Sequence, residues 1–309
     1  MGLLDRFRKS AESKAAEQES EHRQADILTH LRRNEVPSGV LERLQSTASG
    51  TKPWIATLTP AELRIARSHG LKPIAAVSAT CWLHYGWSWT LGHAQGWNTA
   101  LARLSQEARA CGANAVMDVK MRTIPLGIEN SMDFTLIGTA VKVEGWPPSD
   151  SPVIATVPAL EFVKLLEADV VPTGIAIGAH YEWMTDWRNS ANQPWMGNTE
   201  SWQLSQLWET VRQRAHAQLR IASQDRGNGV LAHLNFSQMF EVEREQNERK
   251  FKEYLARHIV IATTVDARRG VPLPHDFKMV VDMHAGKTPL AGTSRHHQSY
   301  GTNESESAI

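Results

Sequence analysis

The spacing between apolar residues changes several times along the middle of the chain, and each spacing predicts a helix or a strand. A short helix is predicted from Thr59, because Thr59 can cap it, Pro60 suits its first turn and Glu62 completes a capping box. The β-branched and small residues of 72–80 then predict a strand. A short capped helix followed directly by a strand therefore opens the first folded unit.

A longer amphipathic helix and two more strands complete this unit. Four apolar residues recur at i, i+4, i+7 and i+11, which places them on one helical face: Trp97, Leu101, Leu104 and Ala108. Strands are predicted at 115–121 and 134–141. After its short helix, the unit therefore has the order β-α-β-β.

The same order occurs a second time. Glu161 and Pro172 lie 99 positions after Glu62 and Pro73, in a second short helix and a second strand. A second long helix is marked by apolar residues at helical spacing: Leu204, Leu207, Trp208, Val211, Ala215 and Leu219. A repeat at a fixed offset indicates a duplicated fold.

The last two strands of the second unit are predicted at 229–235 and 258–265, which follow their counterparts by 114 and 124 positions. The offset grows only between elements, as expected when loops take up insertions. A further strand at 277–282 either extends the second sheet or pairs with another subunit.

The proline-rich stretch Gly145–Pro152 separates the two units, since its three prolines disfavour both helix and central strand. The predicted domains are a polar helical segment at 1–55, a first unit at 56–146, a second unit at 155–284 and a tail at 285–309. The tail is expected to be disordered, because its composition buries too little apolar surface.

One run of residues resembles a known family. The run 108–116, Ala-Arg-Ala-Cys-Gly-Ala-Asn-Ala-Val, is followed by Ser131-Met132 and by Ile-Gly-Thr-Ala-Val-Lys at 137–142, and together they resemble the YbjQ family. That family is often labelled a heavy-metal-binding domain. The second unit keeps Gly-Asn-Gly-Val at 227–230 but lacks the later glycine, and therefore resembles a diverged copy.

The resemblance implies an α+β fold of two tandem, two-layer β-α-β-β units of the YbjQ or dodecin-like kind. Single-unit relatives assemble into five-membered rings through edge strands, so the resemblance implies that the chain binds itself and forms a homo-oligomer, pentameric in the simplest case. It supplies no ligand motif that can be transferred residue by residue.

Charge and composition narrow the partners. The 309 residues include 33 basic and 33 acidic side chains. The chain therefore lacks the excess of basic side chains that attracts nucleic acid, and no nucleic-acid partner is expected. The two cysteines are too few for a disulfide framework. The first residues lack the apolar core of a secretory signal, which favours a cytoplasmic protein.

Soft metal binding is a second hypothesis. Cys81, His84 and His93 fall between the first strand and the first long helix, and His180 aligns with Cys81 in the second unit. Thiolate and imidazole suit Zn, Cu(I) or another divalent or soft heavy-metal ion. The spacing lacks the tight pairs of structural zinc sites, so a core thiol and loop histidines are the alternative.

Tryptophan is concentrated at two corresponding places. Of the 11 tryptophans, those predicted to form an interface are Trp82, Trp87 and Trp89 in the first unit and Trp183, Trp187 and Trp195 in the second. Tryptophan is enriched at interfaces, because it combines a large apolar area with one polar group. Packing within each unit's own core and contact with a ligand or lipid are the alternatives.

No catalytic motif is found in the sequence, and a non-enzymatic protein is expected. The primary hypothesis is therefore a ring-forming assembly or binding protein. The third hypothesis is a membrane-surface scaffold, since Leu3, Leu4 and Phe7 form a small apolar patch beside basic residues.

Overall fold

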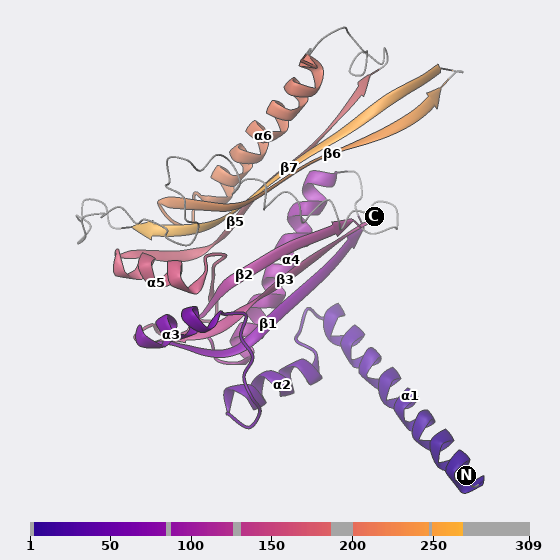
Figure 1. Ribbon diagram of the computed structural model, residues 1–309, viewed down its shortest axis with the longest axis vertical. Helices are drawn as coiled ribbons and strands as arrows, with labels where there is room; N and C mark the ends of the chain where they lie inside the picture. Colours follow the sequence, from indigo (N-terminus) through magenta and orange to yellow (C-terminus); the bar gives the residue numbers. More distant parts are fainter. Residues whose placement is uncertain (1–2, 85–87, 126–130, 187–199, 247–248, 268–309) are drawn as a thin grey trace, which may run out of the picture.

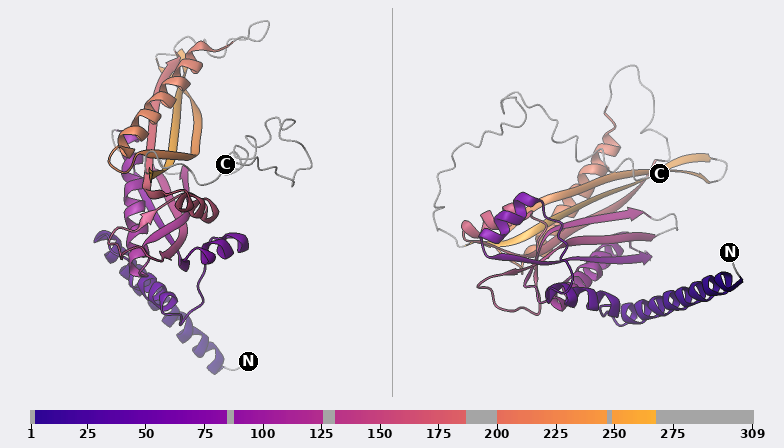
Figure 2. Two further views of the ribbon diagram at one scale, coloured as in Figure 1. Left: turned by 90° about the vertical axis from the view of Figure 1, so that its left-hand side faces the viewer. Right: turned by 60° about the horizontal axis from the view of Figure 1, so that its bottom comes forward.

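The computed structural model describes residues 3–84, 88–125, 131–186, 200–246 and 249–267, and it has the predicted α+β architecture (Figure 1). Two helices come first, α1 (Leu3–Arg32) and α2 (Ser38–Ala48). Figure 2 shows α1 projecting away from the remainder of the chain. The predicted strand at 277–282 and the predicted tail lie outside the described residues.

Two units with the same element order follow. The first contains α3 (Pro60–Ser68), β1 (Leu71–His84), α4 (Trp89–Ala110), β2 (Ala115–Pro125) and β3 (Ser131–Val143). A two-residue strand, β4 (Val153–Ile154), lies in the linker. The second contains α5 (Ala159–Glu167), β5 (Val170–Asp186), α6 (Trp202–Ser223), β6 (Gly229–Gln246) and β7 (Arg249–Ala267).

The predicted capping box of α3 is confirmed. The hydroxyl of Thr59 accepts a hydrogen bond from the Glu62 N–H at 3.3 Å, and the Glu62 carboxylate accepts one from the Thr59 N–H at 2.8 Å. Both donors would otherwise lack a partner within the helix. The long helices and the strands are longer than predicted, and α4 begins at Trp89 because Ser88 caps it there, accepting from the Leu91 N–H.

Sheet topology repeats as closely as the sequence does. The strand orders are β1-β3-β2-β4 and β5-β7-β6, and all neighbours except β2 and β4 are antiparallel. Val77 pairs with Gly138 in the first sheet, and Ala176 pairs with Ala262 in the second, at the offsets found in the sequence. Each first strand also has an irregularity directly after its proline, Pro73 or Pro172, which cannot donate to the ladder.

The two units share one hydrophobic core. Helix α4 packs on one face of the first sheet, where Trp97 and Leu104 of the helix and Phe134 of β3 are fully buried or nearly so. Ile259 and Ile261 of β7 belong to the same cluster. In Figure 1 the second sheet lies beside the first, with α6 on its far face. The contact between the units is therefore part of the core of the protein.

Candidate functional site

The four predicted metal ligands have separate surroundings. β1 continues to His84, so Cys81 and His84 lie three positions apart on one strand and point to opposite faces. Cys81 is buried in the core, where burial raises the pKa of its thiol, while His84 lies within 2.5 Å of the Ser131 hydroxyl on β3. The predicted position of both residues between the first strand and the long helix is wrong, because the strand is longer than its apolar pattern indicated. Cys81 agrees with the alternative of a core thiol.

His93 is a core residue of α4, and its predicted place in a loop is also wrong. Its side chain is completely buried, with Nε2 accepting a hydrogen bond from the Trp97 indole at 3.1 Å. The ring packs edge-on against Phe134, with centroids 5.3 Å apart. Burial, with a smaller contribution from the positive charge of Arg257, lowers the pKa of His93 to about 3. The imidazole is therefore neutral at physiological pH.

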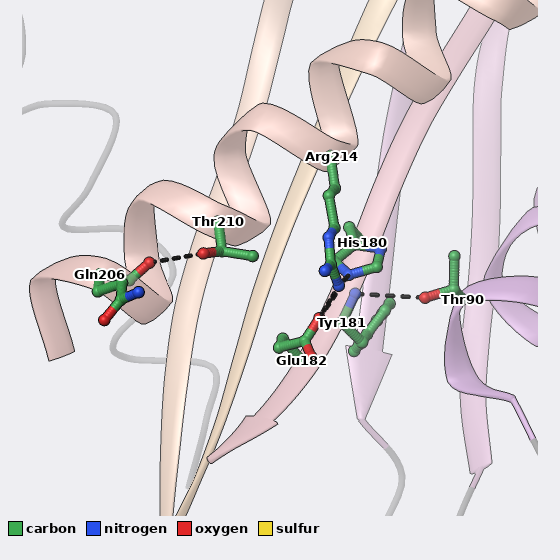
Figure 3. Close-up of polar contacts among 7 residues, drawn as sticks. All are labelled: Thr90, His180, Tyr181, Glu182, Gln206, Thr210 and Arg214. Atoms are coloured by element: carbon green, nitrogen blue, oxygen red, sulfur yellow. Dashed lines mark hydrogen bonds and ion pairs between the residues drawn. The ribbon is translucent and has the colours of Figure 1, made fainter. Parts of the chain in front are cut away.

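His180 belongs to a polar group on the second unit (Figure 3). Its Nε2 lies 2.9 Å from the Glu182 carboxylate on the same strand, and Arg214 reaches from α6 to both side chains. This group links β5 to the helix that covers it. His180 is thus engaged by two charged side chains of its own unit.

The structure does not bring these candidates together. Within the ranges that it describes, no group of three or more His, Cys, Asp or Glu side chains is arranged to hold a metal ion. Cys111, the second thiol, is also buried and donates to the Ala108 carbonyl at the end of α4. A metal site confined to one chain therefore has no support from the described geometry.

The tryptophans divide into different roles. Trp97 fills the core, whereas Trp82 on β1 and Trp183 on β5 are 54% and 45% exposed. Trp89 is half-buried at the first turn of α4, and its ring lies 5.9 Å from that of Tyr181 in the second unit. Three of the predicted interface residues lie outside the described residues: Trp87, Trp187 and Trp195.

Tyr181 is the centre of the contact between the units. Its backbone N–H donates to the Thr90 hydroxyl at 3.3 Å, which joins the outer edge of β5 to the N-terminal turn of α4 (Figure 3). Its ring also lies 5.7 Å from His93, and only 8% of the residue is exposed. The helix of the first unit thus covers the edge strand of the second.

A second contact runs along the other edge of the first sheet. β4 pairs in parallel with β2, and the chain beyond it continues the ladder, with Asp118 donating to Val157 and Val119 donating to Ala155. This segment opens the second unit. The second unit therefore contacts the first at two places, at helix α4 and along the edge of β2 that β3 does not cover.

In both units, a pair of threonines joins the segment before the short helix to the last strand of the unit. Thr57 binds Thr139 through its N–H and its hydroxyl, and Thr156 binds Thr263 in the same way. Sequence analysis missed these residues. The repeated Ile-Ala-Thr at 55–57 and 154–156, again 99 positions apart, was the signal that could have revealed them.

Asn114 joins the turn after α4 to the end of β3. Its side chain binds both backbone groups of Val143, and Asn228 binds Ala267 in the same way in the second unit. Asn114 lies in the run that resembles the YbjQ family. The YbjQ_1 family model, "Putative heavy-metal-binding", matches residues 88–144.

The YbjQ_1 match spans α4, β2 and β3, the helix and the two strands of the first sheet that receive the second unit. The second unit lies outside the matched residues. No curated protein and no solved structure matches the chain. None of the helices in the described ranges is long and apolar enough to cross a membrane.

Charged side chains cover the outer edge of β1, beside the YbjQ_1 match. Arg43 of α2 donates to the Ala76 carbonyl and Arg103 of α4 to the Thr80 carbonyl, while Glu107 accepts from the Ser78 N–H. Burial raises the pKa of Glu107, and the Ser78 N–H and the Arg43 charge oppose that rise. Such side chains protect an edge from unspecific strand pairing.

Proposed function

We propose that this protein is a non-enzymatic assembly module that binds further copies of itself through the type of contact that joins its own two units. The proposal includes the second unit as a diverged copy of the YbjQ_1 domain. Shared register, shared threonine pairs and shared asparagine bonds support this relationship.

One pair of corresponding residues carries the proposal. Tyr181 of β5 is buried because α4 of the preceding unit covers it, whereas its counterpart Trp82 of β1 is 54% exposed. The segments before the two short helices show the same difference in exposure: Ile154 of the second unit is 8% exposed, whereas its counterpart Ile55 of the first unit is 68% exposed. The first unit thus presents an apolar surface that the second unit has already buried.

The second unit presents the complementary surface. Among the described strands, β6 lies at the edge of its sheet. β2 has the corresponding position in the first sheet, where the linker strand β4 pairs with it, and α6 corresponds to α4. Large apolar side chains are exposed on these elements: Trp202, Val230 and Val242. Aromatic and aliphatic side chains exposed in this way are typical of interaction surfaces.

Joining the second unit of one chain to the first unit of the next repeats the internal contact head to tail. Contacts of this heterologous kind close into a ring when the rotation per unit divides a full turn. Helix α2 covers only the start of the β1 edge, at Ala76, and the stretch around Trp82 stays accessible. We therefore propose a closed ring of several chains.

Size-exclusion chromatography with light scattering, at micromolar concentrations of the full chain, tests this function. The wild type should elute as one species larger than a monomer, while Ile55→Glu and Trp82→Glu should shift it towards the monomer. Leu28→Glu is the matched control, because Leu28 is 56% exposed on α1, away from both surfaces. A monomeric wild type, or equal effects of all three substitutions, would contradict the proposal.

A further inference from the structure

A groove lies between α4 and α6, in the contact between the two units but away from the surfaces proposed for assembly. Its volume is about 270 Å³, and its floor is the edge strand β5. It continues into a neighbouring hollow of about 460 Å³, and both are lined by Asn98, Leu101, Ile175 and Arg226.

The two halves of this continuous groove differ in polarity. The first is walled by apolar side chains, among them Leu91 and Ile221, which are 71% and 61% exposed. The second is lined in part by hydroxyl groups, such as those of Ser105 and Thr173. Arg226 lies where the halves meet, and among the described residues that line either half it is the only charged one.

The corresponding place in the first unit is filled. There Arg43, Glu107 and Arg103 bind the outward backbone groups of Ala76, Ser78 and Thr80. The counterparts in β5, 99 positions later, are Ile175, Ile177 and Ala179.

In the second unit this edge is open. Arg226 binds the Ile175 carbonyl, but in the part of the chain that the structure describes no side chain hydrogen-bonds to Ile177 or Ala179. Gln218 of α6 lines the groove without reaching these groups. Where the first unit has a cluster of charged side chains, the second unit therefore has an apolar space with one positive charge at its end.

Arg226 has donors to spare. One of its terminal nitrogens binds the Ile175 carbonyl, and no other partner of its guanidinium is found among the described residues. A guanidinium with free N–H groups binds a carboxylate through charge-assisted hydrogen bonds. One cation next to an apolar wall matches a ligand that carries one negative charge and a hydrocarbon chain.

We propose that this groove binds a single-chain amphiphile with a carboxylate headgroup, such as a medium-chain fatty acid. The carboxylate binds Arg226 and the adjacent hydroxyl groups, and the hydrocarbon chain lies against Leu91, Leu101, Ile177 and Ile221. Each further methylene that is buried should strengthen binding about fourfold, so affinity should rise with chain length up to the end of the groove.

Displacement of a fluorescent fatty acid by dodecanoate, below its micellar concentration, tests the site on the full chain. Arg226→Gln should weaken dodecanoate binding about tenfold or more but leave the binding of the uncharged dodecanoate methyl ester unchanged. Ile221→Glu should weaken both ligands. Arg220→Gln is the control, because Arg220 is exposed in the last turn of α6, six positions before Arg226, and does not line the groove.

Three outcomes would overturn the proposal: no saturable binding of dodecanoate by the wild type, equal losses in Arg226→Gln and Arg220→Gln, or equal affinity for dodecanoate and its ester. Displacement of the probe by an apolar peptide but not by dodecanoate would assign the groove to extended peptides instead. The result is independent of assembly, since Trp82→Glu should bind dodecanoate as the wild type does.

Discussion

Asn114 holds Val143 by both backbone groups: its amide donates to the Val143 carbonyl at 3.0 Å, and its side-chain oxygen accepts from the Val143 N–H at 2.7 Å. This pair fastens the turn after α4 to the end of β3. Asn228 and Ala267 repeat it, but Asn114 is buried and Asn228 is exposed. Identical bonds in different surroundings should differ in their contribution to stability.

We therefore expect Asn114→Ala to lower the free energy of unfolding by about 2 kcal/mol. It removes the side-chain acceptor of the buried Val143 N–H and leaves the Val143 carbonyl only the longer bond from the Trp146 N–H, at 3.4 Å. Asn228→Ala should lower it by less than about 1 kcal/mol, since water can replace the lost bonds. Urea denaturation followed by circular dichroism measures both values. Equal losses in the two variants would contradict this explanation.

Helix α6 approaches the second sheet closely at Gly178. A Cβ atom added there would lie 2.1 Å from the Ala215 carbonyl oxygen, a backbone atom that cannot move aside cheaply. Gly178→Ala should therefore separate helix and sheet and lower stability by roughly 2 kcal/mol or more. Gly39→Ala is the control, because a Cβ at Gly39 meets nothing within 4 Å. Gly39 lies in α2, so alanine should leave stability unchanged or raise it, as thermal denaturation can measure.

His93 should make stability depend on pH. The pKa of His93 is lowered to about 3 in the folded chain, compared with 6.5 for an unperturbed histidine, so the unfolded chain binds a proton first as the pH falls. The contribution of the neutral His93 to the free energy of unfolding is complete above about pH 6.5 and decreases as the pH falls towards 3. Between pH 7 and pH 5 the loss due to His93 should be about 2 kcal/mol.

The variant His93→Gln keeps a hydrogen-bond acceptor for Trp97 and removes the titration. Urea denaturation at pH 7 and pH 5 should therefore give it a smaller loss than the wild type. His258, whose pKa is lowered to about 4 chiefly by burial, titrates in the same window and is present in both proteins. The same loss in both would show that His93 is not the group responsible.

Metal uptake should not depend on the predicted ligands. Cys81 and His84 face opposite sides of β1, so a double variant with alanine at both positions should bind Zn²⁺ with the same affinity as the wild type. Isothermal titration with both proteins at equal concentration measures this. Stoichiometric, high-affinity uptake that the double variant loses would restore the metal-site hypothesis for Cys81 and His84.

Much of the fold could be predicted from local patterns. The capping box at Thr59 and the helical spacing from Trp97 to Ala108 depend on neighbours within a few positions, and both predictions are confirmed. The offset of 99 positions between Pro73 and Pro172 also has a structural counterpart, since each proline is followed by an irregularity at the same point of its ladder. Element ends were less predictable, because Ser88 and not the apolar pattern starts α4.

The sequence by itself determined the order of the elements and the return of that order in the second unit, because hydrophobic periodicity and capping depend on residues that are close in the chain. The tertiary structure alone decided which copies of corresponding residues are buried. Tyr181 is covered and Trp82 is exposed, although the two hold the same place in their strands. The physical reason is that burial depends on contacts between segments far apart in the chain, here α4 against the edge of β5, and these are visible only once the chain is folded.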